Sequence, residues 1–130
     1  MRYMLMMNVP RGNGEWAVTN WAPEDLKAHI NFMHELNKDL QATGERVGAE
    51  GLASPAEARI VRADKKGQPV VSDGPFAETK EFLAGYWIVD VDTAERAYEI
   101  AAKASTAPGR GGAPMNMPIE VRQVMSGPPA

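Results

Sequence analysis

The chain has 130 residues, a formal net charge of -3 and no cysteine, and these properties exclude several classes of protein. A chain of this length forms one domain with a single core. Because its 14 basic residues are scattered among 17 acidic ones, no basic stripe is available for nucleic acid. Without cysteine there is no thiolate nucleophile and no disulfide, so we expect a cytoplasmic location. No apolar run approaches the ~20 residues needed to span a membrane, so we expect no membrane partner.

The chain begins with a predicted strand and a predicted helix. Residues 1–9 are largely apolar on both faces of an extended chain, which is typical of a central strand. Residues 10–22 form a glycine-containing loop with two tryptophans. A helix is predicted from Pro23 to Gly44, because proline suits the first turn and glycine the C-terminal cap. Its apolar stripe consists of Leu26, Ile30, Met33, Leu36 and Leu40.

The middle of the chain predicts an edge strand followed by a hairpin. Residues 46–52 form a mixed strand in which Val47 and Ala49 face the same way. Residues 57–63 and 68–72 flank a polar turn that ends in a glycine, which permits a positive φ. These two segments therefore predict a β-hairpin inserted between the edge strand and the rest of the domain.

The last third predicts a strand, a helix and a final strand. Residues 85–91 are again apolar on both faces and indicate the second central strand. Asp92 and Glu95 have the spacing of a capping box at the start of a helix. Residues 107–118 are rich in glycine and proline and are expected to form a mobile loop. Residues 119–125 alternate as in an edge strand. The apolar positions of the helix are Ala94, Ala97, Tyr98, Ala101 and Ala104.

This order of elements predicts an α+β fold, a ferredoxin-like split βαβ sandwich with an inserted β-hairpin. We expect one domain over residues 1–125 and a disordered tail at 126–130. Both helices would cover one face of the sheet. Each fully buried large apolar side chain contributes ~1.5–3 kcal/mol, so leaving the other face in water would cost a monomer on the order of 10 kcal/mol. We therefore expect a homodimer, a dimeric α+β barrel in which two sheets face each other.

One stretch, DGPFAETK at residues 73–80, concentrates the polar chemistry of the chain. Together with AGYW at 84–87 and EVRQVM at 120–125, it resembles the YCII-related family in its DGPF branch. The resemblance implies a dimeric α+β barrel and a bacterial source, with no settled activity for this branch. It also implies a candidate partner, because some members are encoded beside sigma factors of the extracytoplasmic-function type.

The wider YCII family adds an expectation about catalysis. Its members carry a helix histidine and the aspartate of an Asp-Pro pair after the second helix, and one relative is a dehydrochlorinase that acts on a chlorinated aromatic. In this chain ASTAP stands at residues 104–108, without an Asp-Pro pair. The His–Asp chemistry of the family is therefore not carried over to this chain.

Three residues are candidates for acid–base catalysis, namely Asp73, His29 and Glu50. Asp73 could act as a general base or could close an Asx-turn by accepting its own backbone N–H two residues on. His29 lies in the apolar stripe, where it is either a hydrogen-bonded core residue or a base. Glu50 either faces solvent on an edge strand or projects inward, where it could serve as an acid or base. Phe76 is expected to fill the core beneath the turn.

Five further residues are candidates for ligand binding: Glu78, Lys80, His34, Trp16 and Trp21. The first two lie on the same side of an extended chain and form either a solvated ion pair or one wall of a cleft. The tryptophans pack on the domain or line a cleft. With only two histidines and no ligand spacing, we expect no metal site and no cofactor.

Two functions of different classes remain open, beside a third reading in which the protein is a purely structural dimer. The first is a small-molecule site between the sheet and the first helix, bounded by Asp73, Glu50, a histidine and the tryptophan loop. Its chemistry would be lyase- or isomerase-like proton transfer without a cofactor. The second is a non-catalytic regulatory or protein-binding module with a sigma factor as its candidate partner. The sequence leaves undecided whether the protein is an enzyme.

Overall fold

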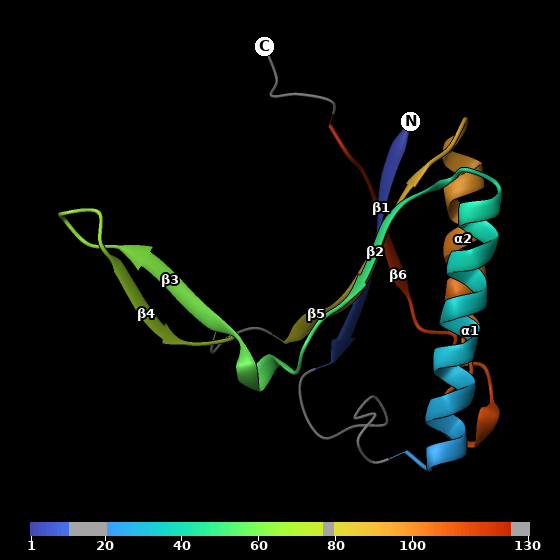
Figure 1. The fold of residues 1–130 in the computed structure, drawn as a ribbon, viewed down its shortest axis with the longest axis horizontal. Coiled ribbons are helices and arrows are strands. Elements are labelled where there is room, and N and C mark those ends of the chain that lie inside the picture. Colours follow the sequence, from blue (N-terminus) through green and yellow to red (C-terminus); the bar gives the residue numbers. More distant parts are fainter. Residues whose placement is uncertain (11–20, 77–79, 126–130) are drawn as a thin grey trace.

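The computed structural model describes residues 1–10, 21–76 and 80–125, and these form a sheet with two helices on one side and a projecting hairpin (Figure 1). The sheet has the order β2-β5-β1-β6, with every pair antiparallel. Its strands are β1 (Arg2–Pro10), β2 (Arg46–Gly51), β5 (Glu81–Asp90) and β6 (Ile119–Gln123). The helices are α1 (Pro23–Ala42) and α2 (Ala94–Ser105), and the hairpin consists of β3 (Arg59–Ala63) and β4 (Pro69–Asp73). Short 3-10 turns are η2 (Pro55–Glu57) and η3 (Arg110–Gly112).

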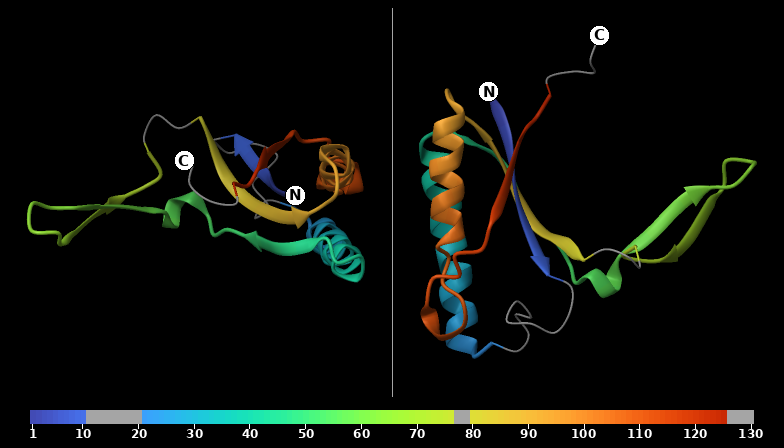
Figure 2. Two further views of the ribbon diagram at one scale, coloured as in Figure 1. Left: turned by 90° about the horizontal axis from the view of Figure 1, so that it is seen from above. Right: turned by 180° about the vertical axis from the view of Figure 1, so that it is seen from behind.

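This arrangement confirms the predicted α+β, ferredoxin-like sandwich. The two segments that are apolar on both faces form the central strands β1 and β5, and the mixed strands β2 and β6 lie at the edges. Both helices cover the same face of the sheet, as the edge-on view in Figure 2 also shows. The expected tail at residues 126–130 lies outside the described residues.

The core fills the space between the sheet and the two helices. Leu5 lies opposite Trp87 across β1 and β5, and Leu5 and Val89 are completely buried. Leu36 and Leu40 reach this core from α1. From α2 come mainly small side chains, which allow that helix to approach the sheet closely: Ala97, Ile100, Ala101 and Ala104.

Several predicted apolar positions do not face the core. Ile30 is exposed, and Phe32 packs against the core instead. Val47 is exposed because the pairing of β2 with β5 shifts register between Arg46 and Gly48, so Val47 lies in a bulge and loses its alternation with Ala49. Tyr98 on α2 is exposed as well.

The start of α2 also differs from the prediction. Its N-cap is Thr93, whose hydroxyl oxygen accepts a hydrogen bond from the backbone N–H of Arg96 at 3.2 Å. The predicted cap, Asp92, lies one residue outside the helix. Thr and Asp are both good N-cap residues, and here they are adjacent, so composition could not decide between them.

The glycine- and proline-rich segment 107–118 is packed against α1, in contrast to the mobile loop that was expected. Pro108 and Pro114 form a β-bridge, and Ala107 and Met117 are buried. Two side chains tie the segment down: the Ser105 hydroxyl donates to the Met117 carbonyl at 2.6 Å, and Asp25 Oδ2 accepts from Gly111 N–H at 2.9 Å. The glycines and prolines of segment 107–118 therefore adopt a defined structure, because side chains of Ser105 and Asp25 hold the segment by hydrogen bonds.

The predicted hairpin is confirmed, and it stands away from the rest of the molecule (Figures 1 and 2). Its turn is closed by Asp64 Oδ1, which accepts from the N–H groups of Lys66 and Gln68 at 2.8 and 2.9 Å. Gly67 has a φ of 80°, the left-handed conformation that glycine adopts at no steric cost. Because the hairpin stands away from the rest of the molecule, it does not cover the face of its own sheet that the helices leave open.

Candidate ligand-binding cavity

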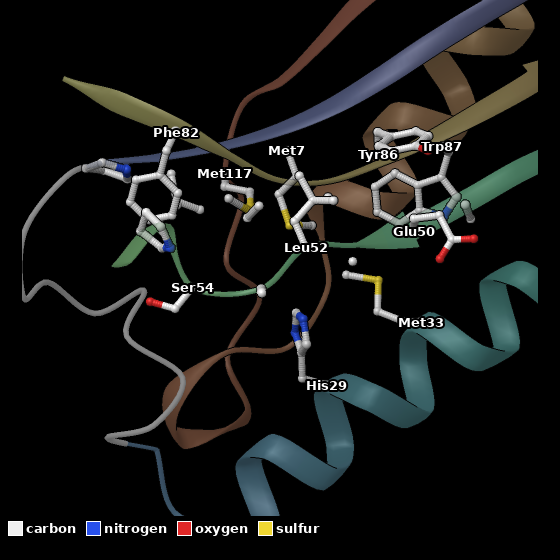
Figure 3. Close-up of a pocket in the computed structure, with 18 of the residues that line it drawn as sticks. Met7, His29, Met33, Glu50, Leu52, Ser54, Phe82, Tyr86, Trp87 and Met117 are labelled. Carbon is white, nitrogen blue, oxygen red and sulfur yellow. The ribbon is translucent and has the colours of Figure 1, made fainter. Parts of the chain in front are cut away.

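A cavity of about 1010 Å³ lies between α1 and the sheet face that carries the core (Figure 3). It forms where the large side chains of the core give way to smaller ones: Ala49, Gly51, Ala53, Ala56 and Gly85 all contribute to its lining. Leu36 and Leu40 fill the same layer further along α1. The unfilled volume thus follows from side-chain size along the strands.

The floor of the cavity is a row of three α1 residues spaced four apart, His29, Met33 and Asn37. Residues at this spacing lie on one face of a helix. The opposite walls come from β1 and β5, from the segment after β2, and from the packed segment 107–118. The lining residues from these walls include Met7, Val9, Leu52, Phe82, Trp87, Met115 and Met117.

His29 points from α1 into the cavity (Figure 3). Its Nδ1 lies 2.9 Å from the carbonyl oxygen of Pro108. A carbonyl can only accept a hydrogen bond, so Nδ1 carries the proton. In the neutral ring Nε2 is then the acceptor. Trp21 contacts the same ring edge-on, with centroids 5.3 Å apart and planes at 85°. The packed segment and Trp21 together fix both the tautomer and the orientation of His29.

Asn37 and Trp87 join the helix to the sheet beside the cavity. Trp87 Nε1 donates to Asn37 Oδ1 at 2.9 Å, across 50 positions of sequence. This bond satisfies the indole N–H of a buried tryptophan, which would otherwise be costly. It also holds the indole ring in place as a wall of the cavity.

Glu50 is placed at the rim of the cavity and not in its interior. It lies on the edge strand β2, its side chain is exposed, and it pairs with Tyr86 across the sheet. Side chains alternate along a strand, so Glu50 belongs to the face opposite that of Ala49. Of the two alternatives for Glu50, the structure has the solvent-facing one, and the burial that an acid–base role would need is not found.

Asp73 lies outside the cavity, at the end of β4 in the projecting hairpin. Its side chain is 95% exposed, and Oδ1 is 3.7 Å from Nε of Arg59. The Asx-turn, which was one of the two alternatives for Asp73, cannot form, because the residue two positions on is Pro75, which has no N–H. Gly74 N–H donates to the Ala58 carbonyl at 2.9 Å instead. The cavity is lined by Gly74 and Pro75, which are joined by a cis peptide bond, and not by Asp73.

The remaining predicted site residues divide into three groups. Trp21 lines the cavity. His34 and Lys80 are exposed and are not among its lining residues. Trp16 and Glu78 lie outside the described residues. Phe76 was expected in the core but is 68% exposed, because the turn that carries it follows the projecting hairpin.

Sequence reasoning missed Met33, Asn37 and the Pro108 carbonyl as parts of the site. The spacing of Met33 and Asn37 from His29 was available in the sequence as a signal. The Pro108 carbonyl could not be found in this way, because 79 positions separate it from His29 and the contact depends on how segment 107–118 packs.

The clearest electrostatic interaction in the described chain is far from this cavity and joins Glu45, the residue before β2, to α2. Arg96 donates from Nε and Nη2 to the two carboxylate oxygens of Glu45 at 2.8 and 2.9 Å. This pairing holds the pKa of Glu45 below its usual range, and Glu45 in turn raises the pKa of Arg96 further above its usual value. The pair is a fixed structural link.

Two comparisons place the chain among known proteins. A family model described as the YCII-related domain matches residues 1–113. The chain belongs to the YCII-related family. The matched range contains the whole of β1 to η3 and so every cavity residue except Met115 and Met117. An uncharacterised protein of Rhizobium meliloti (strain 1021) is 27% identical over 95 residues, which are 73% of this chain and 76% of that protein.

Two further observations concern metals and membranes. In residues 1–10, 21–76 and 80–125, no three or more His, Asp or Glu side chains gather as they would around a metal ion. Neither α1 nor α2 is long and apolar enough to cross a membrane.

Proposed function

We propose that this YCII-related protein binds a small molecule in the cavity above α1, with His29 as the polar anchor. The observation that carries the proposal is the 2.9 Å contact between His29 Nδ1 and the Pro108 carbonyl, which leaves Nε2 as an acceptor on a largely apolar wall. Ligand sites in proteins are typically apolar cavities of ~300–1,000 Å³ with a few fixed polar groups. This cavity has that size and composition.

The lining favours a ligand with an apolar or aromatic body and one hydrogen-bond donor. Methionines on opposite walls, Met7, Met33 and Met117, offer flexible and polarizable contacts to a ring. A hydroxyl or an acidic N–H on the ligand would pair with Nε2 of His29. The same nitrogen would accept a proton in a lyase- or isomerase-like reaction that needs no cofactor.

Thermal-shift measurements with a panel of phenols and small aromatic acids and amides test this proposal. At a ligand concentration of ~100 times Kd, binding stabilises the native state by ~2.7 kcal/mol. We expect the wild type and His34→Ala to gain equally, because His34 is exposed on the same helix. His29→Ala should lose most of the gain. A ligand that stabilises all three proteins equally binds elsewhere and contradicts the proposal.

We further propose that the protein is a homodimer of the DGPF branch that works in the bacterial cytoplasm. Support for the dimer comes from the open face, which we define as the sheet face turned away from α1 and α2. Its centre carries Met4, Met6, Tyr86 and Ile88, all partly exposed in the single chain. Covering these side chains would stabilise the assembly. Light scattering at micromolar concentration checks this, and a monomer mass there would rule it out.

A non-catalytic protein-binding role is the second candidate function. It is favoured by Phe76, a 68% exposed aromatic residue in the DGPF turn, since aromatic anchors are common at the centre of protein interfaces. The resemblance noted above suggests a sigma factor of the extracytoplasmic-function type as partner. Titrating such a purified sigma factor against wild type and Phe76→Ala tests it, with His29→Ala as the control. Undiminished binding by Phe76→Ala would exclude this anchor.

A further inference from the structure

Segment 107–118 is attached to α1 at two points on one side of the helix. The carbonyl oxygen of Pro108 lies 2.9 Å from Nδ1 of His29, and Gly111 N–H donates to Asp25 Oδ2 at 2.9 Å. Asp25 and His29 are four residues apart, so their side chains are neighbours along the helix. The two hydrogen bonds therefore join the same short stretch of the segment to the same turn of α1.

Hydrogen bonds within the segment connect these two attachment points. Gly109 N–H donates to the Ala113 carbonyl at 2.8 Å, and Met115 N–H donates to the Ala107 carbonyl at 2.9 Å. Both bonds lie between backbone groups and close the chain into a compact loop. A displacement of one attachment point is therefore passed on to the other.

The carboxylate of Asp25 has a more specific role than its position in the helix requires. Asp25 and Glu24 both lie in the first turn of α1, where a negative charge balances the positive end of the helix dipole. Asp25 is partly buried and accepts the hydrogen bond from Gly111, whereas Glu24 is exposed. The two acids thus share the interaction with the dipole, and Asp25 adds the link to the segment.

The tautomer of His29 depends on where the segment lies. Nδ1 donates to the Pro108 carbonyl, which leaves Nε2 as an acceptor toward the cavity. An imidazole without a fixed partner samples both tautomers, and a proton on Nε2 would offer the ligand a donor instead. The position of the Pro108 carbonyl therefore decides which kind of ligand atom His29 can pair with.

We propose that Asp25 is a positioning residue, which holds segment 107–118 so that the Pro108 carbonyl keeps the proton of His29 on Nδ1. As a result, the cavity selects ligands that carry a hydrogen-bond donor, such as a phenol, over the matched methyl ether, which can only accept. One neutral hydrogen bond corresponds to a preference of roughly three- to tenfold. This ligand preference rests on the function proposed above, whereas the tautomer is a property of the free protein.

NMR of the imidazole nitrogens in the free protein tests the tautomer, because protonated and unprotonated ring nitrogens differ in chemical shift. The chain has two histidines, so a His34→Ala background leaves His29 as the source of the imidazole signals. Spectra are recorded well above the pH at which imidazoles titrate. We expect the proton on Nδ1 in this background and in Asp25→Asn, which keeps a side-chain oxygen as acceptor. Asp25→Ala should move a large part of the population to Nε2.

Glu24→Gln is the matched control, because it removes a charge from the same turn without removing the bond to Gly111. It should leave the tautomer unchanged. An unchanged tautomer in Asp25→Ala overturns the proposal. An equal change in Asp25→Asn or in Glu24→Gln also overturns it, because the lost charge would then be responsible. Well-dispersed amide signals show that each variant is folded.

Calorimetric titration with phenol and with anisole, its methyl ether, separates this inference from the proposed function. Wild type and Asp25→Asn should bind phenol roughly three- to tenfold more tightly, whereas Asp25→Ala should bind the two within about twofold of each other. If wild type binds neither compound, ligand binding in this form fails, and the NMR result still decides the role of Asp25. An undiminished preference for phenol in Asp25→Ala contradicts the proposed selection.

Discussion

The layer between the helices and the sheet has two ends that behave differently. At one end, Leu36 and Leu40 of α1 close onto Leu5 and Val89, and the space is filled. At the other end, the same helix presents His29 and Met33 to glycines and alanines, and a cavity of about 1010 Å³ remains. One continuous helix thus serves two purposes, and the difference lies in side-chain size and not in backbone architecture. Stability should therefore reside at the filled end and ligand binding at the open one.

Truncating one side chain at each end of the layer tests this difference most directly and should have the largest effect. Leu36→Ala removes a buried side chain from a filled core and should lower the free energy of unfolding by ~2–5 kcal/mol. Met33→Ala removes a partly buried side chain that packs on the core from one side and borders open space on the other, so it should cost less than Leu36→Ala. Urea denaturation of both variants measures the difference. Equal losses would mean that the cavity end is packed in solution.

The glycines at the cavity end allow a finer test. Gly85 and Gly51 pair across β5 and β2. A Cβ on Gly85 would lie 3.0 Å from the backbone oxygen of Glu50, whereas one on Gly51 would meet nothing within 4 Å. We expect Gly85→Ala to destabilise the protein by ~1–3 kcal/mol through this clash.

The control for that test is Gly51→Ala, which adds the same methyl group at the paired position. It should leave the melting temperature nearly unchanged, because the added methyl group meets open space. A similar loss of stability in both variants would show that the cavity end demands glycine for reasons other than close strand approach.

The sequence predicted the fold well because the fold depends on local and periodic signals. The two doubly apolar segments specified the central strands, and Gly67 and Asp64 specified the hairpin turn. The site was less predictable, since its key contact joins His29 to Pro108 through segment 107–118, whose proline and glycine content suggested mobility. Asp73 was predicted near the cavity but lies outside it, for a related reason. Its neighbours in sequence predict a turn, but the position of that turn depends on the direction in which the hairpin β3–β4 projects. Residue type indicated polar chemistry, whereas tertiary packing decided which polar groups meet.

The smallest expected effect concerns the ion pair between Glu45 and Arg96, which links the residue before β2 to α2. Arg96→Met should cost ~1 kcal/mol near neutral pH, because the Arg96 side chain is 41% exposed and solvent screens the pair. The pKa of Glu45 in the folded state lies below its usual 4.5, so the contribution is present above that pH and disappears as the pH falls through the folded value. In melting curves recorded from pH 7 to 3, the melting temperatures of Arg96→Met and wild type should therefore converge only at acidic pH. Lys103→Met, which removes a looser pair with Asp39 at 3.5 Å between half-exposed side chains, should change little at any pH. A gap between wild type and Arg96→Met that stays constant down to pH 3 would mean that the aliphatic part of Arg96, and not its charge, stabilises this end of the layer.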